Sequence, residues 1–173
     1  MFHQIVSHTP LWVWPLLLGL IWLGLSQSVT RSVTLKRITI TPLVMTGLSL
    51  QGTVGAFGAD PAVLSMWLIG AALSAAVVLQ QPVPAQTRYD PWTQRFTVPG
   101  SWMPLLLILG IFVTKYAVGA ALGLNHGLRG NAGFSLGVAA LYGVFSGIFL
   151  ARSARLWRLA HRAEDGHRSI VTP

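Results

Sequence analysis

Long apolar blocks separated by short polar stretches dominate the pattern of this chain. Five of these blocks are each long enough to form a helix that crosses a hydrocarbon layer of about 30 Å. We therefore predict an all-α membrane protein with five transmembrane helices in a single domain, residues 1–164. The predicted spans are 9–27, 38–57, 61–79, 102–124 and 132–151.

The polar stretches between the blocks predict the connections. GADP at 58–61 is typical of a tight turn, with Pro61 as the first residue of the third span. The longest polar stretch, 80–99, has Tyr89 before an Asp-Pro pair and then alternates polar and apolar residues through Phe96. That pattern predicts a short β-hairpin, although a surface loop with aromatic anchors fits it as well.

A basic segment follows the last apolar block. Residues 152–164 continue the helical pattern, and their arginines fall within about a third of a helical turn at 100° per residue. We expect this stripe to face anionic lipid headgroups, with residues 165–173 forming a disordered tail. The arginines of the stripe are Arg152, Arg155, Arg158 and Arg162.

Small residues recur at a spacing of four in the last two blocks. The pairs are Gly119 with Gly123, Gly133 with Gly137, and Gly143 with Gly147. Small side chains at this spacing let helices approach closely in lipid, within one chain or between chains. Because five thin helices are few for a complete transporter, we expect a homo-oligomer or a subunit of a membrane complex.

Composition supports the membrane class and excludes several kinds of chemistry. Charged residues make up 9% of the chain and apolar residues 53%, whereas soluble domains are about 25% charged. The absence of cysteine excludes disulfides, thiolate metal sites and cysteine nucleophiles. The net charge of +8 lies beside the apolar blocks, so it indicates membrane orientation and anionic lipid rather than nucleic acid.

The distribution of lysine and arginine predicts the orientation. Ten of the twelve Lys and Arg residues follow the first, third or fifth span, one (Arg129) follows the fourth, and the last is Lys115 within the fourth span. The positive-inside rule then places the N-terminus outside and the C-terminus in the cytoplasm.

Three segments resemble an uncharacterised family of small bacterial inner-membrane proteins. They are HTPLWVW near the start, GLSLQG in the second span, and FTVPGSWMPLLLILGIFVTKY leading into the fourth. The resemblance implies a bacterial inner membrane. That family has no assigned activity, so the resemblance implies no catalytic or binding residues.

Lys115 is the only Lys, Arg, Asp, Glu or His within the five predicted spans. Ionisable residues inside a span are costly and are functional candidates by default. We predict an outward-facing polar pocket that handles an anion or a proton around this lysine. Snorkelling to the outer headgroups and a structural pair with Asp60 remain alternatives. The candidate binding residues are Lys115, Tyr116, Gln51, Thr53, Asp60 and Tyr142.

Other site chemistry finds little support in the sequence. His126 is a lone loop histidine, with His3 and His8 predicted on the same side of the membrane. The four acidic residues lie outside the spans, so acid–base catalysis within the membrane lacks its usual groups. We expect no enzyme activity, metal or cofactor. The sequence favours a small transport or channel-like component, and a non-catalytic accessory or assembly subunit is the alternative.

Overall fold

The computed structural model describes residues 13–26, 28–82, 87–90, 93 and 95–171. The chain divides into two compact units. The first unit comprises Met1–Thr30 and Gly100–Leu128, and the second comprises Arg31–Pro99 and Arg129–Pro173.

Two helices form the described part of the first unit. Helix α2 (Val13–Leu25) packs on α5 (Met103–Leu124), where Gly24 lies so close to Leu105 that a Cβ atom would overlap it. Helix α2 has 13 residues, or roughly 20 Å at 1.5 Å per residue, which is shorter than a bilayer core. Residues 9–12 and Gln27 of the predicted first span lie outside the described residues. A short 3-10 helix, η1 (His126–Gly130), follows α5.

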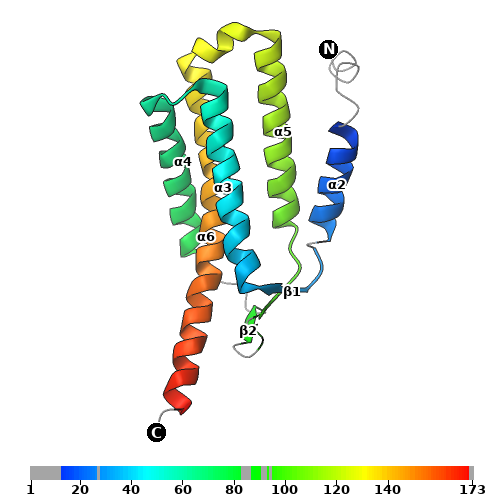
Figure 1. Cartoon of the computed structure of the whole chain (residues 1–173), viewed down its shortest axis with the longest axis vertical. Coiled ribbons are helices and arrows are strands. Elements are labelled where there is room, and N and C mark those ends of the chain that lie inside the picture. Colours follow the sequence, from blue (N-terminus) through cyan, green and yellow to red (C-terminus); the bar gives the residue numbers. More distant parts are fainter. Residues whose placement is uncertain (1–12, 27, 83–86, 91–92, 94, 172–173) are drawn as a thin grey trace. The chain divides into compact units, whose positions relative to one another are not determined.

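The helices of the second unit are α3 (Leu35–Phe57), α4 (Pro61–Gln80) and α6 (Ala132–Val171), and α6 packs against both of the others (Figure 1). In the described part of the chain, four helices are long and apolar enough to cross a membrane: α3, α4, α5 and the Ala132–Arg162 part of α6. The prediction of an all-α membrane protein is confirmed in this outline. The fifth span and the orientation stay predictions.

Glycines bring α4 and α6 into backbone contact. A Cβ atom on Gly143 would meet the carbonyl of Trp67, and one on Gly147 would meet the carbonyl of Ala71. From the other helix, Gly70 lies equally close to the backbone of Ala140. The predicted close packing is therefore confirmed within the chain for the pair Gly143 and Gly147. In contrast, a Cβ atom on Gly119, Gly123 or Gly137 would meet nothing within 4 Å.

Three short strands form an antiparallel sheet in the order β1-β3-β2. They are β1 (Arg31–Thr34), β2 (Arg88–Asp90) and β3 (Arg95–Val98). The predicted hairpin is confirmed, because Tyr89 pairs with Phe96 across β2 and β3. Strand β1 comes from the polar stretch after the first predicted span, for which no strand was predicted, and its Val33 pairs with Phe96 from the other side of β3.

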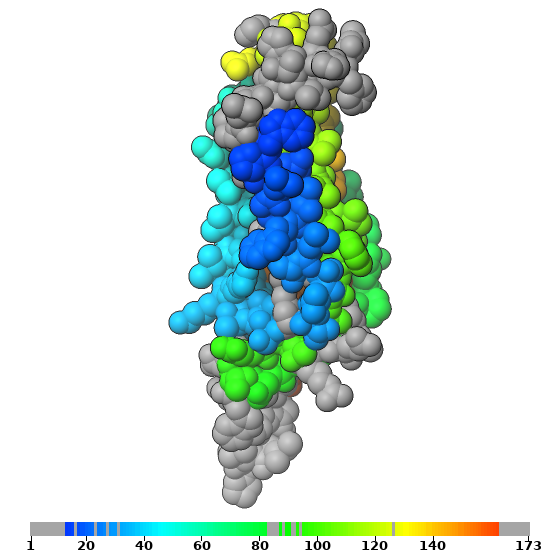
Figure 2. Space-filling view, turned by 90° about the vertical axis from the view of Figure 1, so that its right-hand side faces the viewer, coloured from blue at the N-terminus to red at the C-terminus, as the bar shows by residue number. Residues whose placement is uncertain are grey.

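The sheet builds a small core of its own around Phe96, whose side chain is fully buried. Ile38 from the first turns of α3 and Ala160 from α6 complete this core. The Trp157 indole Nε1 donates to the Thr39 hydroxyl at 2.8 Å and ties α6 to α3 beside it. Figure 2 shows the hairpin, in green, below the first turns of α3. The basic extension of α6 is therefore packed on a folded element. It also continues as helix to Val171, beyond Glu164, where the sequence predicted the helix to end.

Candidate functional site

Two of the predicted binding residues, Lys115 and Tyr116, lie on α5 in the first unit. The Lys115 side chain is exposed, and the Tyr116 side chain is partly buried. The Tyr116 ring stacks on Phe112 one turn earlier, with ring centroids 6.3 Å apart and planes 11° from parallel. Neighbouring Thr114 donates its hydroxyl to the Gly110 carbonyl at 2.7 Å, which is the usual way for a hydroxyl to be satisfied within an apolar helix.

The other four predicted residues belong to the second unit. Gln51 is exposed, and Thr53 is fully buried and donates its hydroxyl to the Ser49 carbonyl at 3.0 Å. Tyr142 is buried, about three turns into α6. Asp60 is exposed and caps α4, since its carboxylate accepts from the Ala62 amide at 2.8 Å. Gly58, with a φ of 79°, makes the turn that precedes this cap.

The six residues therefore divide between the two compact units, with Lys115 and Tyr116 in one and the remaining four in the other. Within the second unit, Thr53 and Tyr142 both join Ser49, whose hydroxyl donates to the Tyr142 carbonyl at 3.1 Å. Gln51 and Asp60 are both exposed, Gln51 on α3 and Asp60 at the end of the turn before α4. The cap gives Asp60 a structural role that the sequence analysis did not assign.

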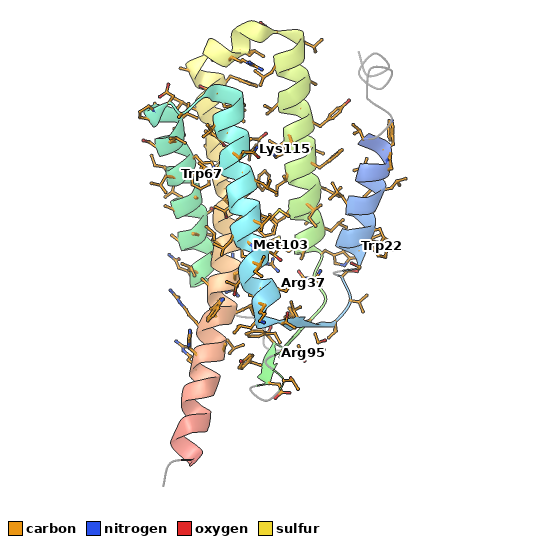
Figure 3. All side chains as sticks on the ribbon, in the orientation of Figure 1. Trp22, Arg37, Trp67, Arg95, Met103 and Lys115 are labelled. Atoms are coloured by element: carbon orange, nitrogen blue, oxygen red, sulfur yellow. The ribbon has the colours of Figure 1, made fainter. Side chains whose placement is uncertain are left out.

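A hydrogen-bonded node at Ser49 joins all three helices of the second unit. The Trp67 indole Nε1 on α4 donates to the Ser49 hydroxyl on α3 at 3.1 Å, and that hydroxyl donates to the Tyr142 carbonyl on α6. Figure 3 labels Trp67 on α4. About two turns further along α4, the Ser74 hydroxyl donates to the Val144 carbonyl at 3.0 Å. Such bonds between membrane helices contribute roughly 0.6 kcal/mol each to stability. We therefore assign this node a structural role.

Of the residues around this node, the sequence prediction named Thr53 and Tyr142 as candidates. Ser49 and Thr53 lie four residues apart, on the face of α3 that meets α6. Trp67 was missed, because a tryptophan within an apolar block gives no sign of which polar atom its indole reaches. The only available signal was the general need of a buried indole N–H for an acceptor.

The basic residues gather at the opposite end of the second unit from Asp60. Lys36 and Arg37 lie in the first turn of α3, Arg95 lies on β3, and all three are exposed. Arg37 and Arg95 are labelled in Figure 3 at this end of the molecule. The sheet, the first turns of α3 and the 152–162 segment of α6 form what we call the basic end.

Arg155 departs from the rest of the predicted stripe. Its guanidinium donates to the Val78 carbonyl at 3.4 Å and also to the Pro82 carbonyl. The Val78 carbonyl lies in the last turn of α4, where it also accepts from the Gln81 amide, and Pro82 follows the helix. The helix dipole is negative at this end. The Arg155 side chain is partly buried there, while Arg158 and Arg162 are exposed.

A hollow of about 300 Å³ lies between the end of α4 and this part of α6. The sequence analysis did not predict it, because it depends on Arg155 folding onto α4. Its lining residues are Leu79, Gln80, Gln81, Pro82, Arg155, Arg158, Leu159 and Arg162.

The groups that the described residues could offer to a ligand are hydrogen-bonding groups and the positive charges of lysine and arginine. In the part of the chain that the structure describes, no three His, Cys, Asp or Glu side chains come together as a metal site. His126 lies at the start of η1, and His3 and His8 lie outside the described residues. The chemistry that the basic end can perform is the binding of an anion.

Comparison with known proteins gives one match. The chain matches the family of unknown function DUF6622 over residues 1–166. No curated protein and no solved structure matches it. The predicted likeness to an uncharacterised family is thus confirmed, and the chain belongs to DUF6622.

Proposed function

We propose that this protein is a non-catalytic accessory or assembly subunit of the bacterial inner membrane, and that it docks through its basic end. The observation that carries this proposal is the folded core around Phe96. A polar loop would be enough to connect two spans, yet the chain joins three strands, α3 and the α6 extension around a fully buried aromatic ring.

A rigid surface of exposed cations at the end of a helical bundle suits a partner of opposite charge. Lys36, Arg37 and Arg95 are held by elements that share the Phe96 core, so their spacing is fixed. Summed positive potential over such a surface attracts and orients acidic partners and anionic headgroups. An acidic protein partner in the cytoplasm is the occupant that the accessory role requires.

The small residues on α5 would give the partner a second surface to bind. The glycines of α4 and α6 at positions 70, 143 and 147 are used within the chain, whereas those on α5 at 119 and 123 are open. Open small residues at this spacing allow another transmembrane helix to approach closely. That helix would belong to a larger complex or to a second copy of this chain.

The proposed orientation places the basic end in the cytoplasm. Lys36, Arg37 and Arg95 follow the first and third spans, and Arg158 and Arg162 follow the last. Under the positive-inside rule these segments stay on the cytoplasmic side, and the Asp60 turn and η1 face outward.

Single cysteines test this orientation cleanly, because the chain has none of its own. Ala59→Cys, in the turn before α4, should react with a membrane-impermeant maleimide on intact spheroplasts. Thr93→Cys, in the hairpin, should react only after the membrane is opened. Labelling of Thr93→Cys alone on intact spheroplasts would show the reverse orientation.

The accessory role predicts a partner that depends on the basic end. Affinity purification in mild detergent should recover a stoichiometric membrane partner with the wild-type chain. Arg37→Gln/Arg95→Gln should lower its recovery several-fold, because two positioned charges are lost. Arg129→Gln, on the other side of the membrane, is the matched control and should retain the partner. Recovery of the chain alone from wild-type membranes would contradict the role.

A transport or channel-like role around Lys115 is the second candidate. It is supported by the lysine's position on a 22-residue apolar helix with its side chain exposed, since intramembrane ionisable residues often line ion or proton pathways.

In liposomes, this role predicts proton or chloride flux that Lys115→Met abolishes while the chain stays folded. Lys36→Met, at the basic end, removes the same charge and should leave the flux intact. Flux would be followed with pH-sensitive and chloride-sensitive dyes. Equal flux for wild type and Lys115→Met would exclude the lysine from the pathway.

A further inference from the structure

The hollow at the end of α4 differs from a diffuse basic surface because it is built from two helices. Arg155 joins them by donating to the carbonyls of Val78 and Pro82. In doing so it covers the negative end of the α4 dipole, which would otherwise repel an anion. None of the eight residues that line the hollow is acidic.

Two arginines remain available to a ligand. Arg158 and Arg162 both line the hollow and are exposed, and they lie four residues apart on α6. Residues at this spacing lie on one helix face about 6 Å apart along the axis. Two guanidinium groups so placed can bind one phosphate from two directions, with charge-assisted hydrogen bonds. Gln80 and Gln81, also exposed in the lining, supply neutral donors.

The depth of the hollow matches the layer of lipid phosphates. Helix α4 has 20 residues, so it is about 30 Å long and ends where the hydrocarbon core ends. Arg155 is level with that end because it donates to carbonyls there. Arg158 and Arg162 lie about one and two turns beyond it along α6.

An apolar path leads from the hollow along α4. Ile69, Leu73 and Val77 lie on one face at a spacing of four, and between 51% and 64% of each side chain is exposed. Gln80 continues this face at the rim of the hollow. A phospholipid whose acyl chains lie on this face of α4 would have its phosphate beside Arg158 and Arg162.

We infer that the hollow is a binding site for the phosphodiester of an anionic phospholipid, held by Arg158 and Arg162 with acyl chains along α4. The preference for an anionic lipid follows from the lining, because the described residues that a cationic headgroup would meet there include three arginines and no carboxylate. The inference rests on the proposed function only in placing this end at the cytoplasmic leaflet.

Native mass spectrometry of the purified full chain in neutral detergent tests this site. Titration with dimyristoylphosphatidylglycerol should retain one lipid per protein, and dimyristoylphosphatidylcholine should not be retained. Arg158→Gln/Arg162→Gln should weaken retention about tenfold or more, as expected for the loss of two charged contacts. Arg37→Gln/Arg95→Gln removes the same charge elsewhere at the basic end and should retain the lipid as wild type does.

Three results would overturn the site: equal loss in both double variants, equal retention of the two lipids, or displacement of the lipid by millimolar inorganic phosphate or by polyglutamate. Arg158→Lys/Arg162→Lys preserves the charge and should keep most of the binding, which guards against a folding defect in the glutamine variant.

Partner recovery separates the two proposals. A wild-type chain that recovers its partner but retains no lipid contradicts the site alone, and a wild-type chain that retains the lipid but recovers no partner contradicts the accessory role alone.

Discussion

The close contact between α4 and α6 is the constraint on which the second unit depends. Without a hydrophobic force between helices in lipid, association relies on close packing and interhelical hydrogen bonds. Gly143 and Gly147 permit both, because they let α6 touch the backbone of α4. That approach brings the Ser74 hydroxyl to the Val144 carbonyl at 3.0 Å. It also brings Arg155 to the end of α4, where the hollow forms.

The side chains that α6 packs against its neighbours change along its length. Within the bundle, α6 presents glycine and serine to its neighbours, but beyond Arg155 it presents Leu156, Trp157 and Ala160 to the sheet. The proposed orientation puts this segment in water, where the burial of apolar surface drives packing between larger side chains. The cations on the other face of the same segment are thereby held at fixed positions.

Much of the fold could be predicted from the sequence, because apolar blocks of helical length and small residues at a spacing of four have direct physical causes. Strand β1 could not, since a four-residue segment becomes a strand only when β3, more than sixty residues later, pairs with it. The site was less predictable. The position of a residue along a helix predicts its depth in the membrane. The direction of its side chain depends on how each helix is rotated against its neighbours, as the exposure of Gln51 and the contact of Arg155 with α4 show.

The measurement that tests this account most directly is the free energy of unfolding of Gly143→Ala and Gly137→Ala, from SDS titration in mixed micelles. Both add one methyl group to the same helix, but only the Cβ at 143 would meet the backbone of α4. The account predicts a loss of about 1–3 kcal/mol for Gly143→Ala, as for other overpacked interiors. Gly137→Ala should be unchanged or slightly more stable. Equal stability of the two variants would contradict the close contact between α4 and α6.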